Sequence, residues 1–153
     1  MKLAAIVCYL FVTLPASAQP RATNLQKMEN FTADSTAIAS VLTDSYFKGI
    51  YTGDVELLKT VYFDGTLLFG DVKGQAYYKT LAQYLDGVKN RQSPKDSGKP
   101  FDAQIQGIGI TNSIAVARVQ VKMYDFVYAE FLSFHKFDGK WLIVNKMISD
   151  IAQ

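Results

Sequence analysis

The sequence predicts an α+β fold, with three N-terminal helices packed on one face of an antiparallel sheet. Near the C-terminus, residues 114–123, 128–136 and 141–148 are dominated by Val, Ile, Phe, Tyr and Trp, which favour strands. Asp138-Gly139 separates the last two segments and is a strong hairpin signal. Upstream, apolar residues recur at the spacing of a helix.

The first eighteen residues have the pattern of a secretory signal peptide. Lys2 precedes an apolar run over residues 3–14, and Ala16-Ser17-Ala18 is a small-residue cleavage pattern, so we expect cleavage before Gln19. A retained membrane anchor or a buried N-terminal strand is the alternative. Cleavage predicts a secreted or periplasmic protein that no longer touches the membrane, and it removes Cys8, the only cysteine.

The helices are predicted in chain order. Residues 19–33 are polar and aperiodic, which predicts a flexible lead-in, and Asp34 or Ser35 can cap the first helix. Its buried stripe comprises Ile38, Val41, Leu42, Ser45, Tyr46 and Gly49. Gly53 ends this helix, and Asp54 caps a short second helix over residues 55–61.

The middle of the chain predicts a turn, a strand, a helix and a loop. Asp64-Gly65 is a turn signal, and residues 66–69 form a short apolar strand. A third helix is expected over residues 76–88, with one face formed by Tyr77, Leu81, Tyr84, Leu85 and Val88. Residues 89–100 predict a solvated loop, and residues 101–110 a strand that Gly107 and Gly109 bend through a bulge.

Both faces of the predicted sheet are apolar, since neighbouring residues such as Phe131 and Leu132 point to opposite sides. One face can pack on the helices. The other would leave a large exposed apolar patch, which predicts a homodimer through this outer face. The mixed charges give a formal net charge of +2 without a basic stripe, so no nucleic-acid partner is expected.

Several segments resemble the NTF2-like superfamily, and more narrowly its SnoaL-like and "putative lumazine-binding" branch. They are Tyr46-Phe47-Lys48-Gly49, Gly53-Asp54, 115–119, 131–134 and 138–146. The resemblance covers about residues 34–150 and implies one NTF2-like domain over 34–153, a cone-shaped α+β barrel. This branch usually has an Asp where the chain has Glu130.

The register of the last hairpin decides which side chains share a face. A two-residue turn at Asp138-Gly139 would place Glu130 opposite Met147. A three-residue loop with a bulge would place Glu130 opposite Lys146 and His135 opposite Trp141. We favour the second register, because it pairs opposite charges across the strands. Val144, Lys146 and Ile148 would then share the face of Glu130, whereas Trp141 and Ile143 would lie on the other.

The resemblance implies pocket positions at Arg118, Leu132 and Ile148, and hence an inward-facing Glu130. The predicted ligand-binding residues are Tyr46, Phe69, Tyr84, Arg118, Glu130, Leu132, Lys146 and Ile148. The alternative is a filled core, in which Glu130 is tied to Arg118 and Lys146 as a structural network. The chain has one histidine, His135, which we expect to pack at the outer face. No metal site or cofactor is expected.

Three functions remain open at the level of sequence. The first is the binding of an unidentified small molecule without chemistry. The second is an acid/base isomerase, cyclase or dehydratase, as in some SnoaL-like relatives, with Glu130 as the base. The third is a dimeric interaction module without a ligand. Enzyme activity stays open as the second function, but we favour binding without chemistry, because the sequence contains no phosphate loop and no nucleophile elbow.

Overall fold

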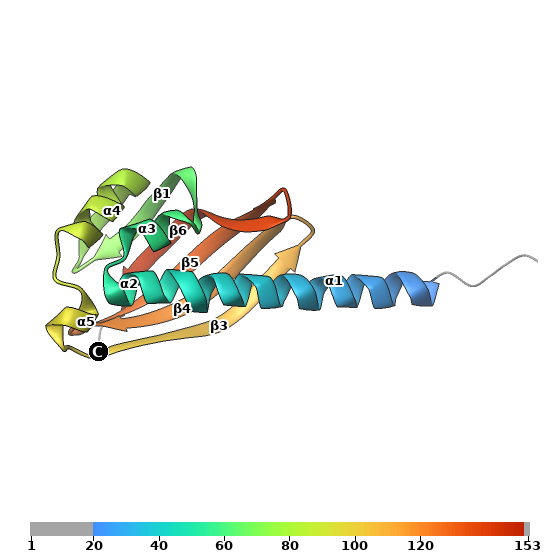
Figure 1. Cartoon of the computed structure of the whole chain (residues 1–153), viewed down its shortest axis with the longest axis horizontal. Coiled ribbons are helices and arrows are strands. Elements are labelled where there is room, and N and C mark those ends of the chain that lie inside the picture. The colour runs from blue at the N-terminus through green and yellow to red at the C-terminus, as the bar shows by residue number, and fades with distance from the viewer. Residues whose placement is uncertain (1–19, 152–153) are drawn as a thin grey trace, which may run out of the picture.

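The computed structural model describes residues 20–151, with a long helical segment lying across one face of a curved, unclosed six-stranded sheet (Figure 1). This arrangement confirms the predicted α+β fold. The expected signal peptide, residues 1–18, lies outside the described residues. Among the described residues, no helix is long and apolar enough to cross a bilayer.

The first helical segment combines α1 (Pro20–Ser40), the π-helical stretch η1 (Val41–Phe47) and α2 (Lys48–Thr52). Helix α1 begins at Pro20, so the predicted start at Asp34 or Ser35 is wrong. Residues 25–33 are exposed, and Figure 1 shows this half of α1 extending beyond the sheet. The apolar residues of this half, Leu25, Met28 and Phe31, remain 48–67% exposed and add nothing to the core, so the search for a buried stripe did not reveal the helix.

The predicted buried stripe is confirmed where α1, η1 and α2 cross the sheet. Ile38, Leu42 and Tyr46 are fully buried. Gly53 ends α2 at a φ of 72°, and the side chain of Asp54 caps α3 (Val55–Lys59) by accepting a hydrogen bond from the Leu57 amide at 2.9 Å.

The predicted helix over 76–88 is wrong in its first part. The strands β1 (Tyr62–Val72) and β2 (Gln75–Thr80) form a hairpin, and α4 begins only at Leu81 and ends at Lys89. The side chain of Thr80 closes a capping box with Gln83 and fixes this start. Strand β1 also extends well beyond the predicted 66–69, and Asp64-Gly65 lies within an irregular part of it rather than in a turn.

The expected loop over 89–100 contains a short helix, α5 (Pro94–Ser97), whose N-cap Ser93 is buried. The remaining strands are β3 (Phe101–Thr111), β4 (Ile114–Met123), β5 (Phe126–Phe137) and β6 (Lys140–Asp150). The predicted antiparallel meander of these strands is confirmed, as is the bulge in β3, which lies between Ile105 and Gly107. Strand β1 adds to β6 in parallel, giving the sheet order β2-β1-β6-β5-β4-β3.

Both predicted registers for the last hairpin are wrong. Phe137 pairs with Lys140 across a two-residue turn, but the register shifts after the pair Phe134 and Ile143, so that Glu130 pairs with Ile148. Val144 is the extra residue of this bulge. One inserted residue reverses the faces of the residues beyond it, so Trp141 and Ile143 lie on the helix side together with Lys146.

Gly70 allows β1 to lie very close to β6. Its φ is +148°, and an added Cβ would lie 1.7 Å from the carbonyl oxygen of Ile148. Because no side chain fits in that space, the contact between the two parallel strands depends on glycine here.

Candidate functional site

Three polar side chains meet beneath the helices, in a part of the molecule that is otherwise apolar. Lys146 Nζ donates to Glu130 Oε1 at 2.6 Å and to Tyr46 Oη at 2.7 Å, and Tyr46 Oη donates to Glu130 Oε2 at 2.6 Å. Glu130 and Lys146 are each 2% exposed, and Tyr46 is fully buried. We call these three residues the inner cluster.

The three residues come from distant parts of the chain. Tyr46 lies in the π-helical stretch η1, Glu130 in β5 and Lys146 in β6. Leu132 is the direct strand partner of Lys146, so Glu130 reaches Lys146 along the strand rather than straight across it. The helical stripe and the bulged hairpin must both form before the cluster is complete.

Each member of the inner cluster compensates the burial of the others. A buried charge is tolerated only where it is paired and hydrogen-bonded, and here both carboxylate oxygens accept a short hydrogen bond. Burial, followed by the Glu130 charge, raises the pKa of Tyr46 well above its usual value, so Tyr46 remains a hydrogen-bond donor. The Lys146 ammonium also lies 5.4 Å and 5.3 Å from the ring centres of Tyr46 and Tyr84, within cation–π range.

A partly open cavity of about 90 Å³ adjoins this cluster. The buried side chains of Glu130 and Lys146 are part of its lining. Its aromatic walls are Tyr77, Tyr84 and Tyr128, and Arg91 adds a further positive charge. Aliphatic and thioether side chains complete the lining: Ile50, Val72, Val121, Met123 and Ile148.

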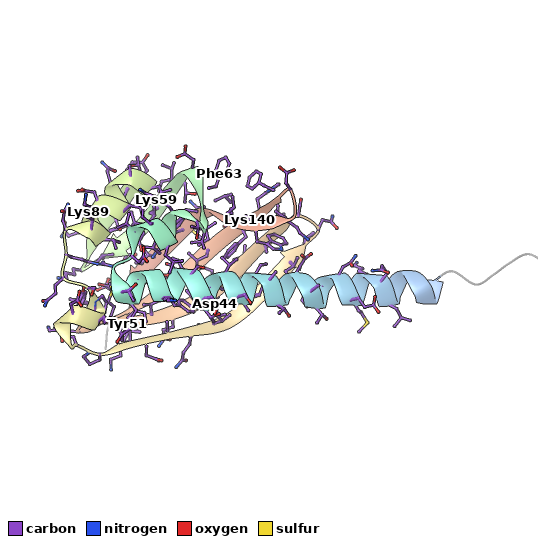
Figure 2. All side chains as sticks on the ribbon, in the orientation of Figure 1. Asp44, Tyr51, Lys59, Phe63, Lys89 and Lys140 are labelled. Atoms are coloured by element: carbon purple, nitrogen blue, oxygen red, sulfur yellow. The ribbon has the colours of Figure 1, made fainter. Side chains whose placement is uncertain are left out.

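Larger hollows lie elsewhere on the surface. A groove of about 540 Å³ between α3 and α4 is lined by Val55, Leu81 and Leu85 together with Lys59 and Lys89, which Figure 2 labels. No charged residue that lines the groove is buried, whereas the lining of the small cavity includes two buried charged residues, Glu130 and Lys146. We therefore take the small cavity as the candidate site.

The structure brings most of the predicted site residues together. Tyr46, Tyr84, Glu130 and Lys146 are in or beside the inner cluster, and Ile148 lines the cavity. Leu132 is fully buried on the same face of the sheet but does not line the cavity.

Arg118 and Phe69 do not belong to this group. Arg118 is exposed, between the buried Ala117 and Val119, and therefore lies on the outer face of the sheet. Phe69 is 38% exposed beside the fully buried Leu68, and its ring packs against Tyr78 at 5.1 Å. The predicted placement of both in the pocket is wrong, because the strand alternation at each position directs the side chain outward.

Strand register places several apolar side chains in one row on this outer face. Tyr78 pairs with Phe69, Phe69 with Met147, and Met147 with Phe131. Arg118 follows as the partner of Phe131. We call the four apolar residues the outer row; each of them is 38–61% exposed.

His135 is half-buried away from the inner cluster, with its ring 4.4 Å from that of Phe137. Its Nδ1 atom is buried and has no hydrogen-bond partner among the described residues. Among residues 20–151, no group of three or more His, Cys, Asp or Glu side chains has the arrangement of a metal site.

The sequence analysis missed four residues around the site. Tyr62 is buried, and its ring lies 6.1 Å from Tyr46 and 6.0 Å from Tyr84. Tyr77 and Tyr128 were assigned to a helix face and a strand without a functional role. Arg91 was assigned to the solvated loop, and nothing in that charge-rich segment distinguishes it from its neighbours.

Comparison with known proteins places this geometry in a family. The model of the family described as "Putative lumazine-binding" matches residues 33–149. The chain belongs to this family. No curated protein matches it.

Solved structures similar to this family member are NTF2-like. One from Silicibacter pomeroyi has a TM-score of 0.71 and 16% identity, and covers 79% of this chain and 98% of its own. One from Shewanella baltica has a TM-score of 0.70 and 24% identity, and covers 80% and 98%. Both are described as of unknown function, and at these identities they establish the NTF2-like fold alone.

Proposed function

We propose that this family member binds a compact small molecule in the cavity beside the inner cluster, without chemistry of its own. The observation that carries the proposal is a partly open cavity lined in part by a buried, hydrogen-bonded ion pair. A filled core would need no opening at this point. An apolar, aromatic-walled cavity with a few convergent polar groups is the usual form of a ligand site.

Binding is better supported than acid/base catalysis. A general base needs a free oxygen within hydrogen-bond reach of the proton that it removes. Glu130 Oε1 already accepts from Lys146 and Oε2 from Tyr46, both at 2.6 Å, so a substrate proton would have to compete with both contacts for the remaining lone pairs. The family description supports a ligand without naming a reaction.

A ligand assay with a blocked variant tests this proposal. A library of compact small molecules is the first set of probes, and lumazine is included because of the family description, with binding read by fluorescence titration and by thermal shift. Native mass spectrometry of the freshly purified protein would identify a co-purified molecule.

Val72→Trp places a large ring at a half-buried position of the cavity wall and is expected to abolish binding. Val55→Trp is the matched control, because Val55 is also half-buried but lines the groove between α3 and α4. A ligand that binds equally well to both variants would contradict the proposal.

The outer row supports a homodimer as the form in which this domain works. Four contiguous exposed apolar residues on a sheet face would be covered by a second copy in an isologous interface. Sedimentation velocity of the wild type and of Phe131→Glu tests this. We expect a dimer at micromolar concentration and a monomer for the variant; a monomeric wild type would contradict the proposal.

Residues 1–18 are proposed to be removed during export to the periplasm or the cell exterior. Intact-mass measurement of the exported protein is expected to give a chain that begins at Gln19. Recovery of the full-length mass from the same fraction would contradict this.

A further inference from the structure

Arg91 is a charged residue without a charged partner at the wall of the candidate cavity. Its Nε atom is buried and has no hydrogen-bond partner among residues 20–151. None of the four ion pairs formed by the described residues includes it. An arginine held at a cavity wall with a donor unsatisfied has a strong requirement for an acceptor.

The charged residues that line the cavity carry a net charge of one positive unit, because only two of the three are paired. Three charged residues line it, namely Arg91, Glu130 and Lys146. Glu130 and Lys146 neutralise each other through a contact of 2.6 Å, so the positive charge of Arg91 remains. A neutral ligand would leave that charge unmatched, and a cationic ligand would be repelled by it.

The walls select for a small and flat molecule. Tyr77, Tyr84 and Tyr128 offer aromatic surface, and the volume of about 90 Å³ is well below that of pockets for drug-sized ligands, which span about 300–1,000 Å³. A cavity that holds one benzene ring measures about 150 Å³, so about 90 Å³ encloses a short branched chain, and a single ring would extend through the partly open mouth.

We propose that the ligand of this cavity is a compact carboxylic acid, whose carboxylate binds the guanidinium of Arg91 and whose apolar body packs among the three tyrosines. This inference rests on the proposed function and specifies the chemical class of its ligand. The planar guanidinium matches a carboxylate in geometry and charge, and it can supply two parallel hydrogen bonds. One free cation in an apolar cavity suits a monocarboxylate better than a multiply charged anion.

Two pairs of isosteric probes test the inference: isobutyrate against isobutyramide, and benzoate against benzamide. Within each pair the shape is nearly constant, while the negative charge is lost and one acceptor oxygen becomes a donor NH2 group. Binding is measured by ligand-detected and protein-detected NMR titration on the wild type, Arg91→Gln and Arg118→Gln. Arg118 is the matched control, because it is an arginine on the outer face of the sheet and does not line the cavity. Thermal unfolding of each variant verifies that it is folded.

We expect at least one acid to bind about tenfold or more tightly than its amide, since a hydrogen-bonded charge contributes at least this much. Arg91→Gln should remove that preference, whereas Arg118→Gln should keep it. Equal binding of acid and amide, or a preference that survives Arg91→Gln, would overturn the inference but leave the cavity as a binding site. Failure of all four probes would also overturn it, while the wider library and the Val72→Trp variant still decide the proposed function.

Discussion

The two faces of the sheet distribute polarity in opposite ways. The face covered by helices contains a buried lysine and a buried glutamate, which are tied to each other and to Tyr46. The uncovered face exposes phenylalanine, tyrosine and methionine in the outer row. A buried ion pair within an apolar core and a row of apolar side chains on an open face both depart from what stability alone would favour. Comparing the two faces therefore separates the two proposals made above, a ligand at the inner face and a second copy at the outer one.

The largest effect should come from removing one charge of the inner cluster. Lys146→Met leaves the Glu130 carboxylate buried beside an apolar side chain, which we expect to lower the free energy of unfolding by about 3–5 kcal/mol. The double variant Glu130→Leu/Lys146→Met should recover most of this loss, because no charge then remains unpaired. Urea denaturation gives both values.

The exposed pair Lys59 and Glu56 supplies the control for that experiment, with side chains 53% and 81% exposed. Lys59→Met should change stability by less than about 0.5 kcal/mol. A loss for Lys146→Met that is no greater than this would show that the buried pair does not hold the inner face together.

Neighbouring residues on β5 compare the two faces directly. Leu132 is fully buried, whereas Phe131 is 42% exposed. Leu132→Ala should cost about 2–5 kcal/mol, because it leaves a cavity in the core. Phe131→Ala should cost far less in dilute monomer, although phenylalanine is the larger residue. A loss for Phe131→Ala that grows with protein concentration would point to the dimer; equal losses at all concentrations would contradict the assignment of faces.

A smaller effect should follow from removing one hydroxyl. Tyr46→Phe deletes the donor to Glu130 and the acceptor for Lys146 while keeping the ring, and should cost about 1–3 kcal/mol. Tyr51→Phe is the control, because Tyr51 is 39% exposed and its ring packs on Phe101. If both variants unfold at the same denaturant concentration as the wild type, the hydroxyl of Tyr46 is not part of the support of the cluster.

The smallest effect concerns the hydrogen bonds that attach α1 to the sheet through Asp34. Asp34 accepts hydrogen bonds from Lys136 Nζ at 2.6 Å and Trp141 Nε1 at 3.1 Å, and the bond from Lys136 is the main cause that lowers the pKa of Asp34 below its ordinary value of 3.8. Because the folded pKa is the lower one, this contribution is present above the unfolded pKa and is lost as pH falls through the folded value.

Asp34→Asn should therefore lower stability by up to about 1 kcal/mol at neutral pH, and the difference from the wild type should vanish in acid. Unfolding curves between neutral and strongly acidic pH measure this. Asp125, whose side chain is 71% exposed in its pair with Lys99, provides the control Asp125→Asn. A difference that persists unchanged at the lowest pH would contradict the assignment to this carboxylate.

Much of the architecture could be predicted from local patterns. Strand-forming segments, the Gly53 helix stop, the Asp54 cap and the Gly107 bulge all depend on neighbours in sequence, and the structure confirms them. Residues 76–80 were assigned to a helix, because Tyr77, Leu81 and Tyr84 also fit helical spacing. The helix begins only at Leu81, where the side chain of Thr80 caps its first turn.

The candidate site was predictable only in part, because it depends on register. Glu130 and Lys146 meet as predicted, but through a bulge at Val144 that no local signal marks. At Arg118 the alternation with Ala117 and Val119 already indicated the outer face, and the resemblance to other pockets was the weaker guide. Arg91 reaches the cavity through tertiary packing alone.

The close contact at Gly70 limits the width of the cavity. Ile148 and Val72 line the cavity, and Gly70 lies two residues before Val72 and opposite Ile148. Any larger residue at position 70 would have to push the β1–β2 hairpin away from β6, because the added Cβ would overlap the Ile148 carbonyl. The width of the opening therefore depends on the missing side chain of Gly70, a residue that does not itself line the cavity. A bulkier residue at position 70 would widen the opening without changing any residue of the lining.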